Sequence, residues 1–169
     1  RGGSKRLPRK NVRVIGGHPL IAHTILAAQK AKLLTDYLVT SEDAEILDVA
    51  RRYGAPTPFV RPPELAGDSV RNIDTVRHAL QFMEANGRAP YDMVVLLQPT
   101  SPVRDPAHID AAVAEEVAIL GRQEGLGQLR RDLVIGNEDP ALLGVLADQR
   151  AVPGVDARGG RRKIGRAHV

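Results

Sequence analysis

The sequence contains no cysteine and no tryptophan, and its apolar runs are short. Without cysteine, neither a disulfide framework nor a thiolate metal site can form. No apolar run approaches the roughly 20 residues that a membrane-spanning helix needs, and no signal peptide is recognisable. We therefore expect a cytoplasmic protein without a membrane partner.

Aromatic residues are also scarce and unevenly placed. The chain has three tyrosines and two phenylalanines, all within its first 91 positions: Tyr37, Tyr53, Phe59, Phe82 and Tyr91. There is no initiator methionine, and the five histidines show no metal-binding spacing. A long segment without aromatics is unusual for a part that must pack, so we expect a fragment of a longer protein.

The net charge of +4 raises the question of an anionic partner. The basic residues gather at the two ends, and no aromatics are interleaved with them to stack on bases. A local anion site plus a basic tail accounts for this balance, so no nucleic-acid partner is expected. The alternative is a non-catalytic basic module that binds nucleic acid through residues 158–166 in a salt-dependent way.

Residues 1–11 combine two glycines with several lysines and arginines. Glycine lets the backbone approach a ligand closely, and the cations can neutralise an anion held against exposed N–H groups. This chemistry suits a polyphosphate. The alternative is a basic arm that is merely solvated.

Apolar periodicity predicts four helices, from Pro19 to about Leu33, from Ser41 to Gly54, from Asp68 to about Gly87 and from Pro106 to about Leu120. Residues 37–40 predict a short buried strand, and the unbroken apolar run at 93–97 predicts a strand covered on both faces. Alternating helices and strands indicate an α/β fold with a largely parallel sheet. Ligands bind beyond the carboxyl ends of such strands, where Thr40–Ser41 and Gln98–Ser101 stand.

The composition changes after Leu120. Nine of the sixteen glycines lie from Gly121 onward, and residues 158–162 form a charged tail. Residues 133–135 could form a strand and 139–146 a short helix. We expect a domain over 1–120, a divergent Gly/Arg-rich segment over 121–163, which a change of reading frame would explain, and an adapter or vector-derived tail over 164–169.

Four motifs occur in one order: 1–5 running into Lys10–Asn11, 17–25, 61–68 and 96–104. Together they resemble the acylneuraminate cytidylyltransferases, or CMP-sialic acid synthetases, over residues 1–118. The resemblance implies a three-layer Rossmann-like nucleotide-diphospho-sugar transferase fold, here incomplete because the first strand and the C-terminal part are missing. It also implies transfer of CMP from CTP to a nonulosonic acid, with release of pyrophosphate and help from Mg²⁺.

The resemblance further implies the site residues. Arg1 and Lys10 would be catalytic, and Arg61 would contact cytosine, whose O2 and N3 acceptors a guanidinium can reach. Asn72 departs from the small hydroxyl residue that is common at its position. The CTP-binding residues implied are Arg1, Gly2, Gly3, Ser4, Lys5, Lys10, Asn11, Arg61, Val70 and Asn72; those for the sugar acid are Gln98, Thr100 and Ser101.

Several properties of the family have no counterpart here. The family's pair of aspartates that binds Mg²⁺ cannot be matched in residues 119–169, so no metal ligand is identified. A homodimer is implied for an intact member, while the oligomeric state of this chain stays open. A sibling CMP-Kdo synthetase is the nearest alternative, although the 98–102 string and Lys10–Asn11 favour the sialic-acid branch.

We expect the purified chain to be an impaired enzyme. Without the aspartate pair, charge at the α-phosphate is incompletely neutralised, which costs orders of magnitude in rate. Pyrophosphate release from CTP, measured with Mg²⁺ and N-acetylneuraminate, should therefore fall far below that of an intact family member. Turnover at a comparable rate would contradict this expectation.

Overall fold

The computed structural model describes residues 7–67, 69–88, 91, 93–122, 134–135 and 142–147. None of the helices in these ranges is long and apolar enough to cross a membrane. The elements are the short 3-10 helices η1 (Lys10–Val12) and η2 (Pro63–Leu65), the helices α1 (Leu20–Lys30), α2 (Ala44–Arg52), α3 (Asn72–Ala85) and α4 (Pro106–Arg122), and the strands β1 (Val14–Ile15), β2 (His18–Pro19), β3 (Asp36–Thr40), β4 (Met93–Leu97), β5 (Val134–Ile135) and β6 (Leu142–Ala147).

The four predicted helices and the two predicted buried strands are confirmed. The main sheet has the order β3-β6-β4-β5. Since β6 is antiparallel to both β3 and β4, those two strands run parallel to each other, and β5 is parallel to β4. The small β1–β2 hairpin is separate from this sheet.

The prediction of a short helix over 139–146 is wrong. Three of the four strands described in the main sheet run in the same direction, and β6 is antiparallel to them. Residues 142–147 form β6, which pairs along its length with β3 on one side and β4 on the other. Both neighbours are buried strands whose backbone groups need partners, and an apolar run can supply them along both edges. The strand predicted at 133–135 is found at Val134–Ile135.

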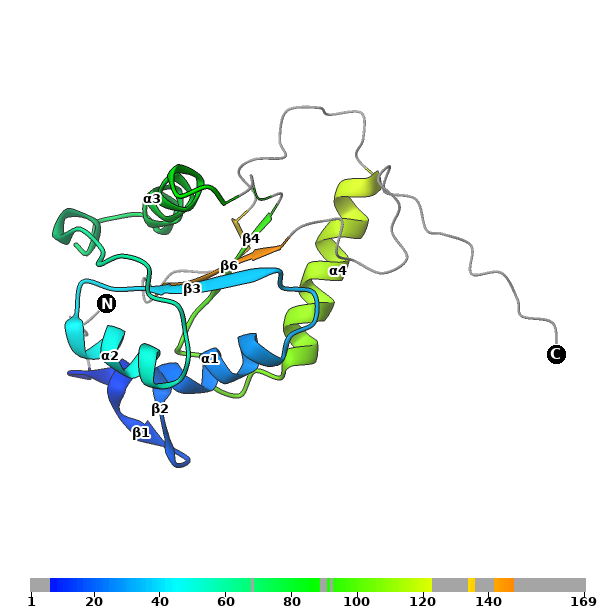
Figure 1. The fold of residues 1–169 in the computed structure, drawn as a ribbon. Coiled ribbons are helices and arrows are strands. Elements are labelled where there is room, and N and C mark those ends of the chain that lie inside the picture. The colour runs from blue at the N-terminus through cyan, green and yellow to red at the C-terminus, as the bar shows by residue number, and fades with distance from the viewer. Residues whose placement is uncertain are drawn as a thin grey trace.

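The sheet is covered by helices on both faces, which gives three layers (Figure 1). On one face, Val39, Val95 and Leu97 pack with residues of α1, α2 and α4 in one hydrophobic cluster. On the other face, Leu38, Val94 and Leu96 pack with Val76 and Met83 of α3. All five residues of β4 are buried, as expected for a strand between two layers of helices.

Helix α3 ends in a Schellman turn. The N–H of Gly87 donates to Glu84 O (3.0 Å), and the N–H of Arg88 donates to Met83 O (3.0 Å). Gly87 has φ +78°, in the left-handed region where a side chain is strained. The amino-terminal end of α3 differs from the predicted start at Asp68, a residue that lies outside the described ranges. The N-cap residue of α3 is Arg71, whose side chain forms no capping hydrogen bond.

The Gly87→Ala variant should therefore lose about 1 kcal/mol of unfolding free energy, because alanine pays the left-handed backbone cost. No atom lies within 4 Å of a Cβ built at Gly87, so the loss measures conformation rather than a clash. The matched control is Gly67→Ala, where the φ is ordinary and the nearest contact is 3.7 Å. Chemical denaturation of both variants checks this, and equal stabilities would contradict it.

Candidate nucleotide site

The carboxyl ends of β3 and β4 lie at one edge of the sheet because the two strands run parallel (Figure 1). Helix η1 packs against α1 and α2 near this edge. Arg9, just before η1, forms an ion pair with Glu45 in the first turn of α2. The Thr24 hydroxyl of α1 donates to the backbone O of Gln98, just beyond β4, at 3.5 Å. Three segments distant in sequence thus meet at this edge.

Two of the predicted CTP-binding residues, Lys10 and Asn11, lie in the tight turn of η1. The N–H of Lys10 donates to Leu7 O (3.2 Å), and Arg9 before it adopts a positive φ of 57°. Lys10 is half-buried, and Asn11 is buried. The glycine loop itself, Arg1, Gly2, Gly3, Ser4 and Lys5, lies outside the described residues.

Arg61, predicted to contact the base, is at the same edge but is wholly enclosed. Its side chain is 0% exposed. The guanidinium donates to the backbone O of Thr40, the last residue of β3, at 2.6 Å, and the Arg61 N–H donates to Ser41 O at 3.0 Å. Arg61 therefore holds the proline-rich segment 55–62 against the end of β3, and in this arrangement a ligand cannot reach it.

The turn from β3 into α2 is held by Asp43, which corrects the predicted start of this helix at Ser41. The Asp43 carboxylate accepts the backbone N–H groups of Glu45 (2.9 Å) and Ile46 (3.4 Å). Ser41 is buried and its hydroxyl accepts the N–H of Asp43 at 3.1 Å. A β-region φ of −90° at Asp43 is the usual geometry of an N-cap, so the helix begins two residues later than a Ser41 cap would place it.

The residues predicted to contact the sugar acid form a turn just beyond β4. The Ser101 N–H donates to Gln98 O (3.4 Å), and the Thr100 hydroxyl donates to Gln98 Oε1 (3.5 Å). The Gln98 Nε2 is buried and has no hydrogen-bond partner within the described part of the chain. An amide N–H in this position is a costly group to bury unless a ligand accepts from it.

Arg104, to which the sequence analysis assigned no role, carries a second group of this kind in the same segment. Its Nη1 is buried without a hydrogen-bond partner among the residues described, and burial lowers the pKa of the guanidinium. The only signal in the sequence was its place at the end of the 96–104 motif. Val70 and Asn72, the remaining predicted residues, lie where the chain enters α3, and both are half-buried.

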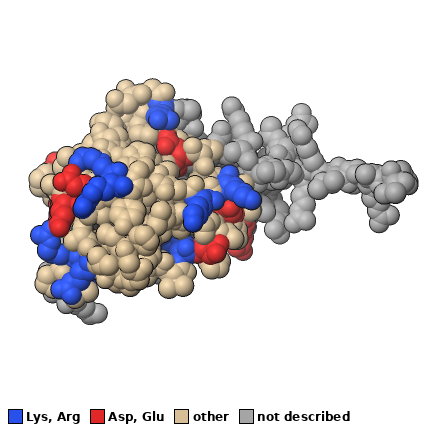
Figure 2. Space-filling view, turned by 60° about the horizontal axis from the view of Figure 1, so that its bottom comes forward, with Lys and Arg blue, Asp and Glu red and all other residues tan. Residues whose placement is uncertain are grey.

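The charged side chains near this edge do not form a metal cage. No group of three histidine or acidic side chains gathers within metal-binding reach in the described ranges. Most of residues 119–169, where the family's aspartate pair was sought, lies outside the described residues. On the face shown in Figure 2, basic and acidic side chains lie beside one another around a broad uncharged area.

The chain matches a family model described as cytidylyltransferase over residues 1–118. It is 46% identical over 114 residues to the CMP-N,N'-diacetyllegionaminic acid synthase of Legionella pneumophila, covering 67% of this chain and 48% of that one. It is 39% identical over 103 residues to the pseudaminic acid cytidylyltransferase of Campylobacter jejuni, with 61% and 44% covered. The chain thus spans about half the length of these relatives.

A third relative is the N-acylneuraminate cytidylyltransferase of Escherichia coli, 38% identical over 113 residues, which cover 67% of this chain and 26% of that one. Among solved structures, a CMP:2-keto-3-deoxy-manno-octonic acid synthetase complexed with CTP is similar with a TM-score of 0.53 and 13% identity, covering 89% of this chain and 71% of the other. At that identity the likeness concerns the fold alone.

The cap at Asp43 generates a stability prediction. Asp43→Ala should lower the unfolding free energy by about 1 kcal/mol, because two N–H groups of α2 lose their acceptor. Asp48→Ala is the control, since that carboxylate is exposed and only forms a surface ion pair with Arg51 (2.8 Å). Thermal or chemical denaturation should separate the two variants. A smaller loss for Asp43→Ala than for Asp48→Ala would refute the capping role.

Proposed function

Because the chain belongs to the cytidylyltransferase family, we propose that its fold serves the transfer of CMP from CTP to a nonulosonic acid. In this reaction the anomeric hydroxyl oxygen of the sugar acid attacks the α-phosphorus of CTP. The bond from that phosphorus to the bridging oxygen breaks, and pyrophosphate leaves. Such a transfer needs mainly positioning of the two substrates and neutralisation of charge.

The observation that carries the proposal is the combination of the family match over 1–118 with the meeting of η1, Arg61 and Gln98 at one edge of the sheet. The relatives named above carry CMP-legionaminic, pseudaminic and N-acylneuraminate activities in their names. All of these sugar acids are nonulosonic acids, which is why we propose this substrate class.

We propose that Lys10 and Asn11 bind the phosphates of CTP, together with the glycine loop of residues 1–5. Lys10 is half-buried and begins the tight turn of η1. A phosphate there gains more from a nearby cation than it would in bulk solvent. Lys10 would then also neutralise charge that develops during the transfer, as its catalytic role requires.

We propose that Arg61 contacts the cytosine base after the segment 55–62 has moved. Its guanidinium is enclosed and donates to Thr40 O, so a contact with cytosine needs the segment 55–62 to move away from the end of β3. Val70 and Asn72 would line the base pocket from the entry of α3. Since Arg61 connects this segment to β3 through its hydrogen bond to Thr40 O, nucleotide binding and movement of the segment would be coupled.

For the sugar acid, we propose the turn that follows β4. The buried Nε2 of Gln98 is a donor suited to a carboxylate or hydroxyl oxygen, and Thr100 and Ser101 stand beside it on exposed positions. The described residues present no acidic cluster for Mg²⁺, so no metal ligand is assigned among them.

The test compares two lysines. Lys10→Ala should weaken CTP binding by tenfold or more, because a partly buried phosphate contact is lost. Lys30→Ala should leave it unchanged, since Lys30 is exposed at the far end of α1. Isothermal titration of the full chain with CTP gives both affinities. Equal CTP affinities for the two variants, or no CTP binding by the parent chain, would contradict the proposal.

A further inference from the structure

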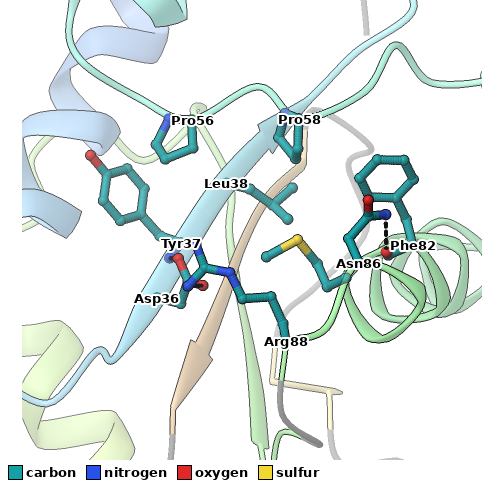
Figure 3. Close-up of a pocket in the computed structure, with 9 residues that line it drawn as sticks. Asp36, Tyr37, Leu38, Pro56, Pro58, Phe82, Asn86 and Arg88 are labelled. Atoms are coloured by element: carbon teal, nitrogen blue, oxygen red, sulfur yellow. Dashed lines mark hydrogen bonds and ion pairs between the residues drawn. The ribbon is translucent and has the colours of Figure 1, made fainter.

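A cavity of about 260 Å³ opens at the amino-terminal end of β3, at the opposite end of that strand from Arg61 and Thr40. Its volume is just below the roughly 300 Å³ at which drug-sized pockets begin, so it suits a molecule about the size of one ring with a short substituent. The lining residues come from β3, the loop after α2 and the end of α3: Asp36, Tyr37, Leu38, Pro56, Pro58, Phe82, Met83, Asn86 and Arg88 (Figure 3).

Two local features build this cavity. The Val39 N–H donates to Pro56 O at 2.8 Å, which lays the loop carrying Pro56 and Pro58 alongside β3. The Schellman turn at Gly87 reverses the chain after α3 and brings Arg88 to Asp36, with an ion pair of 3.2 Å. The cavity is thus enclosed by backbone hydrogen bonds on one side and by an ion pair on another.

The interior is mostly apolar. Figure 3 shows the rings of Pro56 and Pro58 above Leu38, with Phe82 on the facing helix. The two prolines are exposed, and neither carries a backbone N–H that would need a new partner if it were covered. A flat apolar ring placed here would remove proline and phenylalanine surface from water without stranding a donor.

Of the two charged residues that line the cavity, Asp36 and Arg88, the positively charged Arg88 has more hydrogen-bonding groups left for a ligand. The Asp36 carboxylate is already occupied, since it accepts from the Tyr37 N–H (2.9 Å), the Tyr91 hydroxyl (3.1 Å) and Arg88. Burial and the adjacent Asp36 raise the pKa of Tyr91 to about 12, so the phenol keeps its proton as a donor. The Arg88 side chain is 62% exposed, and within the described part of the chain it forms one ion pair, which leaves most of its N–H donors available.

We propose that this cavity binds a small molecule made of one flat apolar ring and a carboxylate. The ring would lie between the two prolines and Phe82, and the carboxylate would pair with Arg88. An anion is favoured over a cation because Asp36 already has three donors, whereas Arg88 has one acceptor among the described residues. This site does not overlap Lys10, Arg61 or Gln98, so its occupation does not require nucleotide.

The chain offers a direct readout, because Met83 and Met93 are its only methionines. Met83 lines the cavity, whereas Met93 packs in the cluster on the opposite face of the sheet. With both methyl groups labelled with carbon-13, titration with 3-phenylpropionate should shift the Met83 signal saturably and leave the Met93 signal in place. Absence of a saturable Met83 shift at millimolar probe, or equal shifts of both signals, would overturn the proposal.

Two comparisons test the chemistry of the site. Arg88→Met should weaken 3-phenylpropionate about tenfold, while Arg77→Met, an exposed arginine on α3 that pairs with Asp74, should not. The neutral 3-phenylpropanamide should bind the parent chain about as weakly as the acid binds Arg88→Met. Equal affinity of acid and amide for the parent chain would overturn the assignment of an anionic ligand.

A filled cavity provides the last check. Asn86 is exposed on the cavity wall, so Asn86→Trp should occupy the space and abolish binding of both probes. An unchanged Met93 signal would confirm that this variant is folded. Persistent Met83 shifts in Asn86→Trp would place the probe elsewhere and refute the site. None of these measurements uses CTP, so their outcome is independent of the proposed cytidylyltransferase function.

Discussion

The burial of β4 on both faces is the constraint from which the rest of this structure follows. Each residue from Met93 to Leu97 is covered, alternately by the α1, α2 and α4 layer and by α3. A strand in that position must have its backbone paired on both edges, and β6 and β5 provide the partners. Because β4 ends at Leu97, the polar turn that begins at Gln98 lies at the carboxyl edge, near the end of β3.

At the same edge, Arg61 is buried and has a structural role. Arg61 fastens the proline-rich segment to Thr40, so one side chain serves the closed structure and is also the residue proposed for the base. At the other end of this segment, Pro56 and Pro58 line the cavity that Arg88 also lines. The segment 55–62 thus connects the proposed nucleotide site with the proposed second site. Two backbone hydrogen bonds hold it against β3 and the residue that follows: the Val39 N–H donates to Pro56 O, and the Arg61 N–H donates to Ser41 O.

The sequence predicted the elements better than their pairing. Helical periodicity, the short segment 37–40 and the apolar run at 93–97 were sufficient, because each is a local pattern. Residues 142–147 were misread, since a short apolar run fits a helix or a strand until a partner is known, and the partners lie about 50 and 100 residues away. Asp43 was preferred over Ser41 as the cap because its carboxylate reaches two N–H groups. The enclosure of Arg61 depends on long-range contacts that no motif carries.

The account centres on CTP binding at the carboxyl ends of β3 and β4. Hydrogen–deuterium exchange of the full chain with and without CTP tests it most directly. The account predicts slower exchange on nucleotide addition at residues 9–12 and altered exchange over 55–62, with residues 86–88 unchanged. Exchange that is unaffected at η1 and in the proline-rich segment, under conditions where CTP is bound, would contradict it.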